Sequence, residues 1–454
     1  MQNKVKKPVR TISGVTPLTV VLKPRKCNHG TCVYCPGGDF VPQSYTNKSP
    51  AIMRALIFNF DPYEQVKNRL EMLENMGHPT DKIEIIILGG TFMQYIDDYK
   101  NEFIKRCFDA LNGKEAINLN EAKKLNENAE HRCVAMCIEN RPDNCSEEEI
   151  RKMLSYGTTR VEIGVQMPDD YLYLKTNRGH SVKDVVEATR ALKNAGFKVG
   201  YHVMPGLPSS NVKKDLELFK MLFESRDFRP DQLKIYPCQI IKDSPLAKTY
   251  KMINFKPYTE EETREMLVKM MKIIPEYCRV MRVMREFPKE KLIMGLERLG
   301  LRKDVEADLR NKNVKINEIR MREIGFNKTW DSKTKLKIIE YEASNGKEFF
   351  LEFVNEDDVL FGLLRLRIFD DKAIIRELHV YGQSLNIGQH GKNVSQHRGI
   401  GKLLMKKAEE ITKENNINKL SIISGIGVRE YYKNLGYELE GSYMVKNIPI
   451  FKDS

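Results

Sequence analysis

The segment Cys27-Asn-His-Gly-Thr-Cys32-Val-Tyr-Cys35-Pro-Gly-Gly38 brings three cysteines into nine residues. Its C-x4-C-x2-C spacing and its glycines allow a tightly curled loop whose thiolates converge on one metal centre. A 4Fe–4S cluster held by three cysteines keeps one iron free, and that iron can chelate the amino and carboxylate groups of S-adenosylmethionine. A structural zinc site with His29 as fourth ligand, or three buried thiols, fits the same spacing. The segment therefore predicts a site on Cys27, Cys32 and Cys35 and leaves its kind open.

Length and composition set the class of protein. At 454 residues the chain is too long for one ordinary core, so we expect two folded units and a connector. Hydrophobic residues at 41% and charged residues at 30% are typical of a soluble globular protein. The sequence has no apolar run of membrane-span length and no apolar signal core at its N-terminus. Nine cysteines without a disulfide spacing fit a reducing compartment. We therefore expect a cytoplasmic protein with no membrane partner.

The charge distribution indicates a polyanionic partner. The net charge is +13, and the first 26 residues carry seven Lys or Arg and no acidic residue. A second basic band runs from Arg279 to Arg322, although acidic residues interleave it. The two bands together favour a nucleic-acid surface.

From residue 18 to about 275, short apolar runs alternate with amphipathic stretches. This alternation predicts a parallel sheet with helical crossovers, and six such units predict a partial (β/α)6 barrel. Catalytic residues of βα barrels follow the strands, so Gly89-Gly90-Thr91 and Gln166 become candidate ligand contacts. Asp61 followed by Pro62 predicts a helix start. The candidate strands are 18–22, 83–88, 133–138, 160–166, 197–203 and 232–236.

Cys133 and Cys137 lie four residues apart on one of these strands. Side chains alternate along a strand, so we expect both thiols on the same face. Small buried residues are the expected role, rather than a second metal site.

Several segments in order along the chain resemble the catalytic subunit of Elongator, of archaeal type. That family joins a radical-SAM domain to a GNAT-type acetyltransferase domain, and the match covers essentially the whole chain. The segments are the cysteine loop, DKIEIIILGGTFM (81–93), ENRPD (139–143), RVEIGVQ (160–166), TNRGH (176–180), LKIYP (233–237), QHRGIG (396–401) and REYYKNLGYE (429–438).

The resemblance implies an α/β architecture of three parts. Residues 1–286 form a radical-SAM partial barrel with a basic N-terminal strand, and 287–328 form a basic helical linker. Residues 329–454 form a GNAT-type α+β domain that binds acetyl-CoA, with candidate strands 335–341, 349–354, 359–368 and 373–380. Family members often bind zinc through cysteines near the end of the linker. Residues 314–322 contain no cysteine here, so we expect no zinc site there.

The second unit supplies candidate acetyl-CoA contacts. Backbone N–H groups at a glycine-rich turn and helix start can cradle a pyrophosphate, and Ile400, Leu404, Ala408 and Ile411 lie on one apolar stripe of the predicted helix. The resemblance implies that the strand ending at Val380 and the Lys82 side chain contact acyl-CoA. The alternative for Lys82 is an ordinary solvated lysine. Residues 387–395 are expected to form a loop near the coenzyme. The candidate contacts are Lys82, Glu377, Leu378, His379, Val380, Gln396, His397, Arg398, Gly399, Ile400, Gly401, Lys402, Leu403 and Tyr432.

Three residues are candidates for catalysis in the second unit. Tyr432 is the expected general acid or substrate-orienting hydroxyl, and Tyr431 lies beside it. One of the two tyrosines is expected to be a core residue. His379 can serve as a base at neutral pH, and a packed strand histidine is the alternative.

The resemblance implies a linked reaction that uses a 4Fe–4S cluster, S-adenosylmethionine and acetyl-CoA. Reductive cleavage of S-adenosylmethionine gives a 5′-deoxyadenosyl radical, which takes hydrogen from the methyl group of acetyl-CoA. The carbon radical adds to carbon 5 of the wobble uridine, and thioester hydrolysis leaves a carboxymethyl group. Unpaired bases of a tRNA anticodon stem-loop can be splayed into a basic cleft. The expected enzyme is a tRNA carboxymethyluridine synthase.

Two other functions are compatible with the sequence. The first is acetyl transfer to protein lysines with the iron–sulfur domain as a scaffold, although a scaffold needs no open iron. The second is an RNA-binding module with an inactive barrel. Family members usually carry a further basic N-terminal segment, so weaker tRNA binding is expected here. The sequence leaves a homodimer and other Elongator subunits open.

Overall fold

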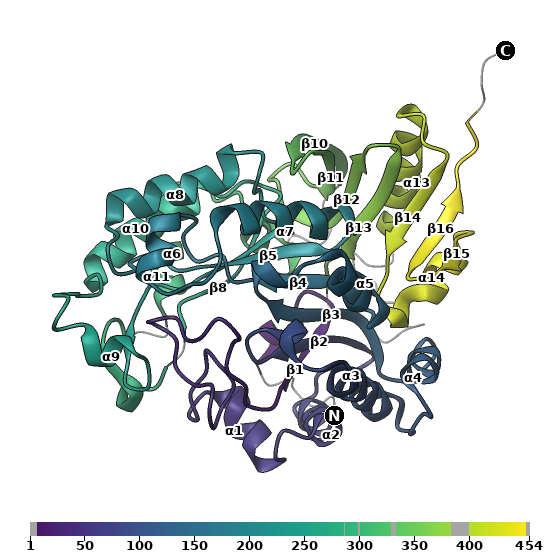
Figure 1. Ribbon diagram of the computed structural model, residues 1–454. Helices are drawn as coiled ribbons and strands as arrows, with labels where there is room; N and C mark the ends of the chain where they lie inside the picture. The colour runs from purple at the N-terminus through teal and green to yellow at the C-terminus, as the bar shows by residue number, and fades with distance from the viewer. Residues whose placement is uncertain (1–6, 286, 298–299, 328–332, 383–398, 451–454) are drawn as a thin grey trace.

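Two seven-stranded sheets organise the chain in the computed structural model (Figure 1). The structure describes residues 7–285, 287–297, 300–327, 333–382 and 399–450. The first sheet lies among the N-terminal and central helices, and the second sheet lies beside it with the C-terminal helices (Figure 1). Among the described helices, none has both the length and the apolar composition that crossing a membrane requires.

The first sheet is parallel, with the order β1-β2-β3-β4-β5-β6-β8. Consecutive strands are neighbours, which confirms the predicted partial barrel, and β1 and β8 are its two edges. β8 is a seventh strand that sequence analysis assigned only to a basic band. The strands are β1 (Thr16–Val21), β2 (Lys82–Leu88), β3 (Arg132–Asn140), β4 (Arg160–Ile163), β5 (Lys198–Val203), β6 (Gln232–Ile235) and β8 (Arg279–Val283).

Side-chain caps begin most of the crossover helices. The Asp61 carboxylate accepts a hydrogen bond from the Glu64 N–H at 2.9 Å, and Pro62 is the first helical residue, which confirms the predicted start. α5, α7 and α10 begin with reciprocal capping boxes, and such a cap stabilises a helix by about 1 kcal/mol. The helices are α1 (Pro50–Ile57), α2 (Pro62–Asn75), α3 (Asp97–Asn112), α4 (Leu119–Asn126), α5 (Glu147–Ser155), α6 (Asp170–Lys175), α7 (Val182–Asn194), α8 (Val212–Glu224), α9 (Leu246–Thr249) and α10 (Glu260–Ile273).

β4 ends at Ile163, so the expected strand through Gln166 was too long. Gln166 has φ 62°, in the left-handed region that non-glycine residues rarely adopt. Its N–H donates to the His202 carbonyl at 2.7 Å, and its carbonyl accepts from the Met204 N–H at 3.2 Å. These two bonds hold the chain in a bend rather than an extended strand.

Cys133 and Cys137 do not share a face, which corrects the expectation from their spacing. Cys133 pairs with Ile83 and Cys137 pairs with Ile86, with a register shift between these pairs. Ile83 and Ile86 are three apart on β2 and therefore point to opposite faces. Both thiols are buried, and burial raises the pKa of each to about 12. Their expected role as small buried residues is confirmed.

The second sheet is mixed, with the order β10-β11-β12-β13-β14-β16-β15. β13 and β14 are parallel and pair only through Ala373–Ile375 and Leu420–Ile422. A register shift between β12 and β13 leaves Arg376 as an extra residue, where β13 bends away from β14. The elements are β10 (Lys335–Ala343), β11 (Gly346–Val354), β12 (Leu360–Phe369), β13 (Lys372–Val380), α13 (Ile400–Glu414), β14 (Lys419–Ile423), α14 (Arg429–Lys433), β15 (Glu438–Glu440) and β16 (Tyr443–Asn447).

The segment between the sheets packs on the barrel. It contains β9 (Leu292–Met294), which pairs with β7 (Ile240–Ile241), and the helices α11 (Leu301–Asn311) and α12 (Ile319–Arg322). Arg302 on α11 forms an ion pair with Glu318 at 2.7 Å, and the Ile319 N–H donates to the Cys278 carbonyl. The domain boundaries at 286 and 328 stay predictions.

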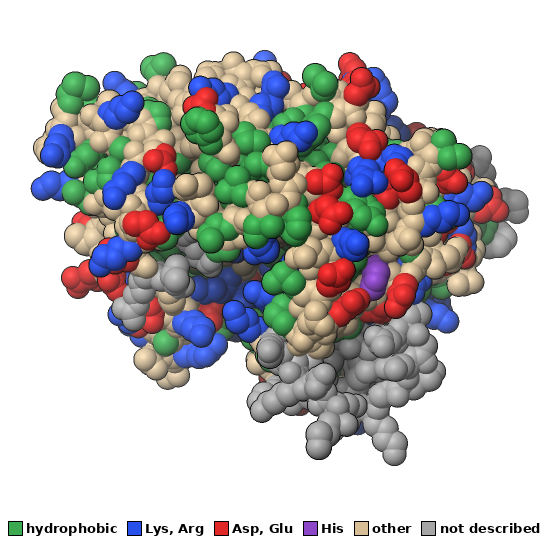
Figure 2. All heavy atoms as spheres, turned by 90° about the horizontal axis from the view of Figure 1, so that it is seen from below, with side chains coloured by type: hydrophobic (Ala, Val, Ile, Leu, Met, Phe, Trp, Pro, Cys, Tyr) green, Lys and Arg blue, Asp and Glu red, His purple; other side chains and the backbone are tan. Residues whose placement is uncertain are grey.

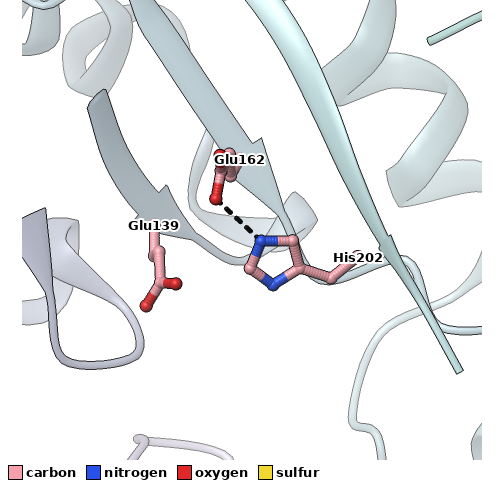
Figure 3. Close-up of side chains that lie close together, drawn as sticks. All are labelled: Glu139, Glu162 and His202. Atoms are coloured by element: carbon pink, nitrogen blue, oxygen red, sulfur yellow. Dashed lines mark hydrogen bonds and ion pairs between the residues drawn. The ribbon is translucent and has the colours of Figure 1, made fainter. Parts of the chain in front are cut away.

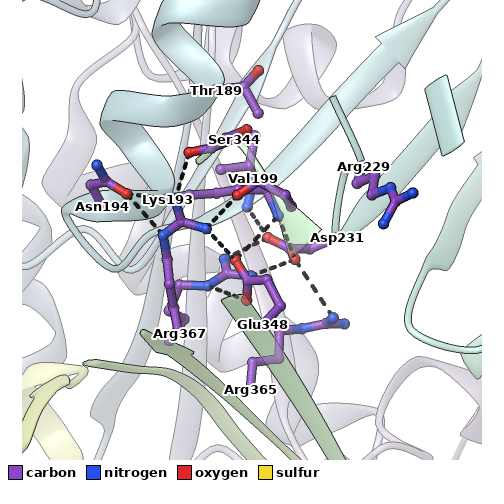
Figure 4. Close-up of polar contacts among 12 residues, drawn as sticks. Thr189, Lys193, Asn194, Val199, Arg229, Asp231, Ser344, Glu348, Arg365 and Arg367 are labelled. Atoms are coloured by element: carbon purple, nitrogen blue, oxygen red, sulfur yellow. Dashed lines mark hydrogen bonds and ion pairs between the residues drawn. The ribbon is translucent and has the colours of Figure 1, made fainter. Parts of the chain in front are cut away.

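A buried ion network joins the two sheets (Figure 4). Arg376 on β13 donates to both Asp231 carboxylate oxygens at 2.7 and 2.8 Å and to Glu348 at 2.8 Å. Arg367 also pairs with Glu348, and Lys193 on α7 lies 3.4 Å from Asp231. Each of these five side chains is at most 2% exposed. The network therefore crosses from the barrel to the second sheet inside the protein.

Candidate active site

A cavity of about 550 Å³ lies inside the partial barrel. Residues of β1 to β6 and β8 line it, and so do all three cysteines of the predicted metal site. Cys27 follows the carboxyl end of β1 in a loop where Gly37 has φ 82°. A Cβ on Gly37 would lie 2.5 Å from the Pro42 carbonyl oxygen, so this curl of the loop requires glycine.

The three thiols differ in their electrostatic surroundings. Burial opposes ionisation of Cys32, but Arg178, at 3.5 Å from its Sγ, and His29, at 3.4 Å, outweigh burial and lower its pKa to about 6. Burial and the neighbouring Cys32 raise the pKa of Cys35 to about 12. Cys27 is half-buried, with its Sγ 3.7 Å from the Thr91 hydroxyl. One thiol is thus prepared as a thiolate, which is the form that binds metal.

The surroundings of His29 fit a three-thiolate cluster better than a closed zinc site. Its Nε2 lies 3.1 Å from the Arg141 guanidinium, which can only donate. Arg141 is held there by Asp143 and by the Arg178 carbonyl. A zinc ion on this nitrogen would have to displace Arg141. Arg178 beside Cys32 and Arg141 beside His29 instead add positive charge that would suit an anionic, thiolate-bound iron–sulfur cluster.

The candidate S-adenosylmethionine contacts lie at the carboxyl end of the sheet. Gly90, Thr91 and Gln166 line the cavity with the cysteines. Gly89 has a packing role, because a Cβ there would lie 2.8 Å from Leu22. The left-handed backbone of Gln166 is strained, and such strain often marks a functional position.

Sequence analysis placed Glu139 after a strand at the barrel mouth but did not predict the charged row that it forms with Glu162, His202 and Lys234 across the cavity. The His202 Nε2 lies 2.8 Å from a Glu162 oxygen, and Glu139 lies beside them (Figure 3). Lys234 forms an ion pair with Glu162 and lies 3.8 Å from Glu139, so its ammonium takes the position that a cation would need. Burial opposes ionisation of Glu162, but Lys234 and Arg160 hold its pKa well below the ordinary value. The sequence signal for this row was Glu162, a charged residue between two apolar residues of a strand.

Lys82 lies at the opposite end of the sheet from the cysteines. It begins β2 beside Arg132, which packs closely against Gly427 of the second unit. Burial lowers the pKa of Lys82. The expected acetyl-CoA contact of Lys82 stays a prediction, and its place at the junction of the two units fits that role.

Successive side chains at the end of β13 point alternately toward the barrel and toward the apolar core. Glu377 pairs with Lys198 and Arg365, and the His379 Nε2–H donates to the Ser13 carbonyl at 2.8 Å. Burial lowers the pKa of His379, which keeps its ring neutral. Leu378 and Val380 are partly buried on the apolar core. The role of His379 as a base stays a prediction, and only its Nδ1 remains to accept a proton.

The helix start predicted for pyrophosphate lies at the opening between β13 and β14. Gly399 has φ 74° and precedes α13, whose first residues are Ile400, Gly401, Lys402 and Leu403. The expected apolar stripe is confirmed, since Ile400, Leu404, Ala408 and Ile411 are buried. The predicted contacts Gln396, His397 and Arg398, and the loop 387–395, lie outside the described residues.

The two tyrosines of α14 have different surroundings. Tyr432 is 6% exposed, and its ring lies between Tyr431 and Tyr437. Tyr431 is 36% exposed, and a Cβ on Gly401 would lie 2.8 Å from its hydroxyl. The Tyr431 hydroxyl therefore sits at the start of α13. The role of Tyr432 as general acid stays a prediction, and Tyr431 is the more accessible of the two hydroxyls at the helix start.

Replacing each tyrosine by phenylalanine separates these roles. We expect Tyr431→Phe to slow release of coenzyme A by about tenfold, the size of one lost hydrogen bond to a charged group, because it removes the hydroxyl that can contact the bound coenzyme at the helix start. Tyr432→Phe should change the rate by less than about threefold. Thiol release from acetyl-CoA in the presence of RNA measures both. A large loss in Tyr432→Phe alone would return the role to Tyr432.

Three family models match the chain. They are the Radical SAM superfamily at residues 21–222, the Radical SAM C-terminal domain at 230–311 and the Acetyltransferase (GNAT) family at 315–437. The first and last match the two units predicted from sequence.

Relatives match over nearly the full chain. A Methanocaldococcus infernus protein named tRNA uridine(34) acetyltransferase is 46% identical, over 98% of this chain and 87% of that protein. The Homo sapiens Elongator complex protein 3 is 38% identical, over 97% of this chain and 85% of that protein. A solved structure, the archaeal Methanocaldococcus infernus Elp3 with N-terminus deletion (1-46), matches with TM-score 0.85 and 42% identity, over 96% of this chain and 100% of that one. This chain therefore belongs to the family that contains the tRNA uridine(34) acetyltransferases and Elongator complex protein 3.

Proposed function

We propose that this chain modifies uridine 34 of tRNA, using S-adenosylmethionine and acetyl-CoA to place a carboxymethyl group on carbon 5. Relatives at 46% and 45% identity are named for action on uridine 34 of tRNA. The reaction would break a methyl C–H bond of the acetyl group by hydrogen transfer to the 5′-deoxyadenosyl radical and join that carbon to carbon 5 of the base. The base would then lose its carbon-5 hydrogen as a proton and return one electron to the cluster, and water would hydrolyse the thioester to release coenzyme A.

The charge of the cavity is the observation that carries the proposal. Eight arginines and one lysine line it, against two glutamates. Such a surface attracts polyanions, and an unpaired anticodon base can enter a basic cavity while its phosphates stay at the rim. Lys and Arg side chains also surround a hollow on the face seen from below (Figure 2). The cationic residues are Arg10, Arg54, Arg69, Arg141, Arg160, Arg178, Arg282, Arg285 and Lys234.

The barrel residues have separate tasks in this proposal. Cys27, Cys32 and Cys35 would hold a 4Fe–4S cluster, which supplies the electron that cleaves S-adenosylmethionine. Arg178 places positive charge beside the Cys32 thiolate, and the His29 ring lies 3.4 Å from the same sulfur. Gly90 and Gln166 border the space where the sulfonium substrate would lie.

The second unit would present acetyl-CoA. β13 is unpaired to β14 beyond Ile375, so the backbone of Glu377–Val380 lies along the opening where the pantetheine arm would run. The N–H groups at the start of α13 would hold the pyrophosphate. The Tyr431 hydroxyl lies at that helix start and can donate a hydrogen bond to the bound coenzyme there.

Acetyl transfer to protein lysines with the barrel as scaffold is not favoured. A scaffold has no need for three thiols in one cavity with a thiolate-stabilising arginine, and the named relatives act on tRNA. An RNA-binding module with an inactive barrel is disfavoured for the same reason.

A labelling experiment tests the proposal. Protein reconstituted anaerobically with iron and sulfide is incubated with S-adenosylmethionine, a reductant, an anticodon stem-loop RNA and acetyl-CoA deuterated on its methyl group. We expect deuterium in 5′-deoxyadenosine and a carboxymethyl adduct on uridine 34. The matched control is the same stem-loop with cytidine at position 34. Cleavage of S-adenosylmethionine without deuterium transfer and without adduct would overturn the proposal and favour acetyl transfer alone.

A further inference from the structure

Three arginines from separate segments line one part of the cavity. Arg10 lies in the turn before β1, Arg54 lies on α1, and Arg69 lies on α2. Ser49 and Pro50, at the N-terminal end of α1, line the cavity with them. A helix N-terminus carries partial positive charge, so it adds to the charge of the three guanidinium groups.

This arginine triad is unlike the other arginines of the cavity. Arg141 pairs with Asp143, Arg160 pairs with Glu84, and Arg285 donates to the Ser44 carbonyl. Among the residues that the structure describes, no ion pair or hydrogen bond joins the guanidinium group of Arg10, Arg54 or Arg69 to any protein group. Arg54 and Arg69 are half-buried and Arg10 is exposed, and a half-buried charge without a partner is costly to desolvate. The triad therefore lacks a counter-ion.

The triad members are close enough to repel one another. Burial, followed by the charges of Arg54 and Arg10, lowers the pKa of Arg69 to about 10. Burial and Arg10 also lower the pKa of Arg54. A guanidinium group is a permanent cation in proteins, so the cavity gathers three cations that disfavour one another.

We propose that Arg10, Arg54 and Arg69 form a phosphate-binding site at the edge of the barrel cavity. Guanidinium groups match the geometry of phosphate oxygens, and one phosphate can accept from several arginines. Two ligands of the proposed function carry phosphates, the RNA backbone and coenzyme A, so the choice of source rests on that function. The triad lies beside β1 and away from α13, so the phosphate is assigned to the RNA.

Binding measurements with three probes test the site. They are an anticodon stem-loop RNA, coenzyme A and 3′-dephospho-coenzyme A, each titrated into the full chain. We expect Arg54→Gln combined with Arg69→Gln to weaken RNA binding by at least about tenfold, as loss of charged hydrogen bonds does. The slope of log affinity against log salt should fall by about 0.7 for one lost phosphate contact on a single strand. Binding of both coenzymes should stay unchanged. The matched control is Arg190→Gln, because Arg190 is exposed on α7 outside the cavity.

Thermal stability separates a binding role from a structural one. Removing mutually repelling charges should raise the melting temperature of the double variant without ligand, whereas loss of structural arginines would lower it. Arg69→Lys keeps the charge and should retain part of the RNA affinity. RNA affinity and salt slope equal to those of Arg190→Gln would overturn the site. Selective loss of binding to coenzyme A but not to its 3′-dephospho form would assign the phosphate to the coenzyme and overturn the RNA assignment.

Failure of the site and failure of the proposed function give different results. If the triad variants bind RNA normally and wild-type protein modifies uridine 34, the site fails and the function stands. If RNA binding depends on the triad and wild-type protein forms no adduct, the site stands and the function fails.

Discussion

Cys32→Ser is expected to lose iron–sulfur loading and to reduce 5′-deoxyadenosine formation on the order of 1,000-fold, about 4 kcal/mol in transition-state free energy. Cys32 is the thiol whose pKa Arg178 and His29 bring to about 6 against the effect of burial. A serine hydroxyl does not ionise in this range, so it cannot replace the thiolate as a ligand. Visible absorption and bound iron report cluster loading, and liquid chromatography reports 5′-deoxyadenosine.

Cys145→Ser is the matched control for this prediction. Cys145 is also buried, but it lies outside the cavity and its sulfur bonds to the Asn140 amide and the Arg141 carbonyl. A serine hydroxyl can make both bonds, so this variant should load iron and turn over normally. Cys32→Ser protein with normal iron content and turnover would contradict the assignment of Cys32 as a cluster ligand.

Local sequence signals predicted the parallel sheet and the cysteine loop well. Strand and helix alternation depends on nearby residues, and the cap at Asp61 needs only the residues that follow it. Cys27, Cys32 and Cys35 line the same cavity because they lie in one loop, so their shared position is likewise local.

Features that depend on partners distant in sequence could not be predicted. The register shift beside Cys133 reverses the face of that thiol, and nothing in the strand's own residues announces it. β8 was hidden by its arginines, since Arg279 pairs with Glu323 far along the chain. Glu162 and His202 meet only because β4 and β5 are neighbours.

Strand β13 lies between the barrel and the opening proposed for acetyl-CoA. Its Arg376, Glu377 and His379 bond to barrel residues, whereas its backbone borders the opening toward β14. These contacts hold β13, and with it the opening proposed for acetyl-CoA, against the barrel. Breaking them should therefore affect both stability and the linked reaction.

Arg376→Met is expected to lower the free energy of unfolding by about 3–5 kcal/mol, because it leaves Asp231 and part of Glu348 buried without their main counter-ion. Burial alone would raise the pKa of Asp231, but Arg376 and Lys193 outweigh it and hold that pKa well below the ordinary value. A depressed carboxyl pKa stabilises the fold above the unfolded pKa of about 3.9, and this contribution is lost as pH falls toward the folded pKa. The variant should therefore differ most from wild type near neutral pH and least in acid.

Chemical denaturation followed by circular dichroism at several pH values measures this difference, with Arg190→Met as the exposed control. A double variant, Arg376→Met with Asp231→Asn, tests the cause directly. If the loss comes from an uncompensated buried charge, neutralising Asp231 should recover part of the stability. Additive losses in the double variant would mean that Arg376 acts through packing instead. The ion pair would then not be what holds β13 to the barrel.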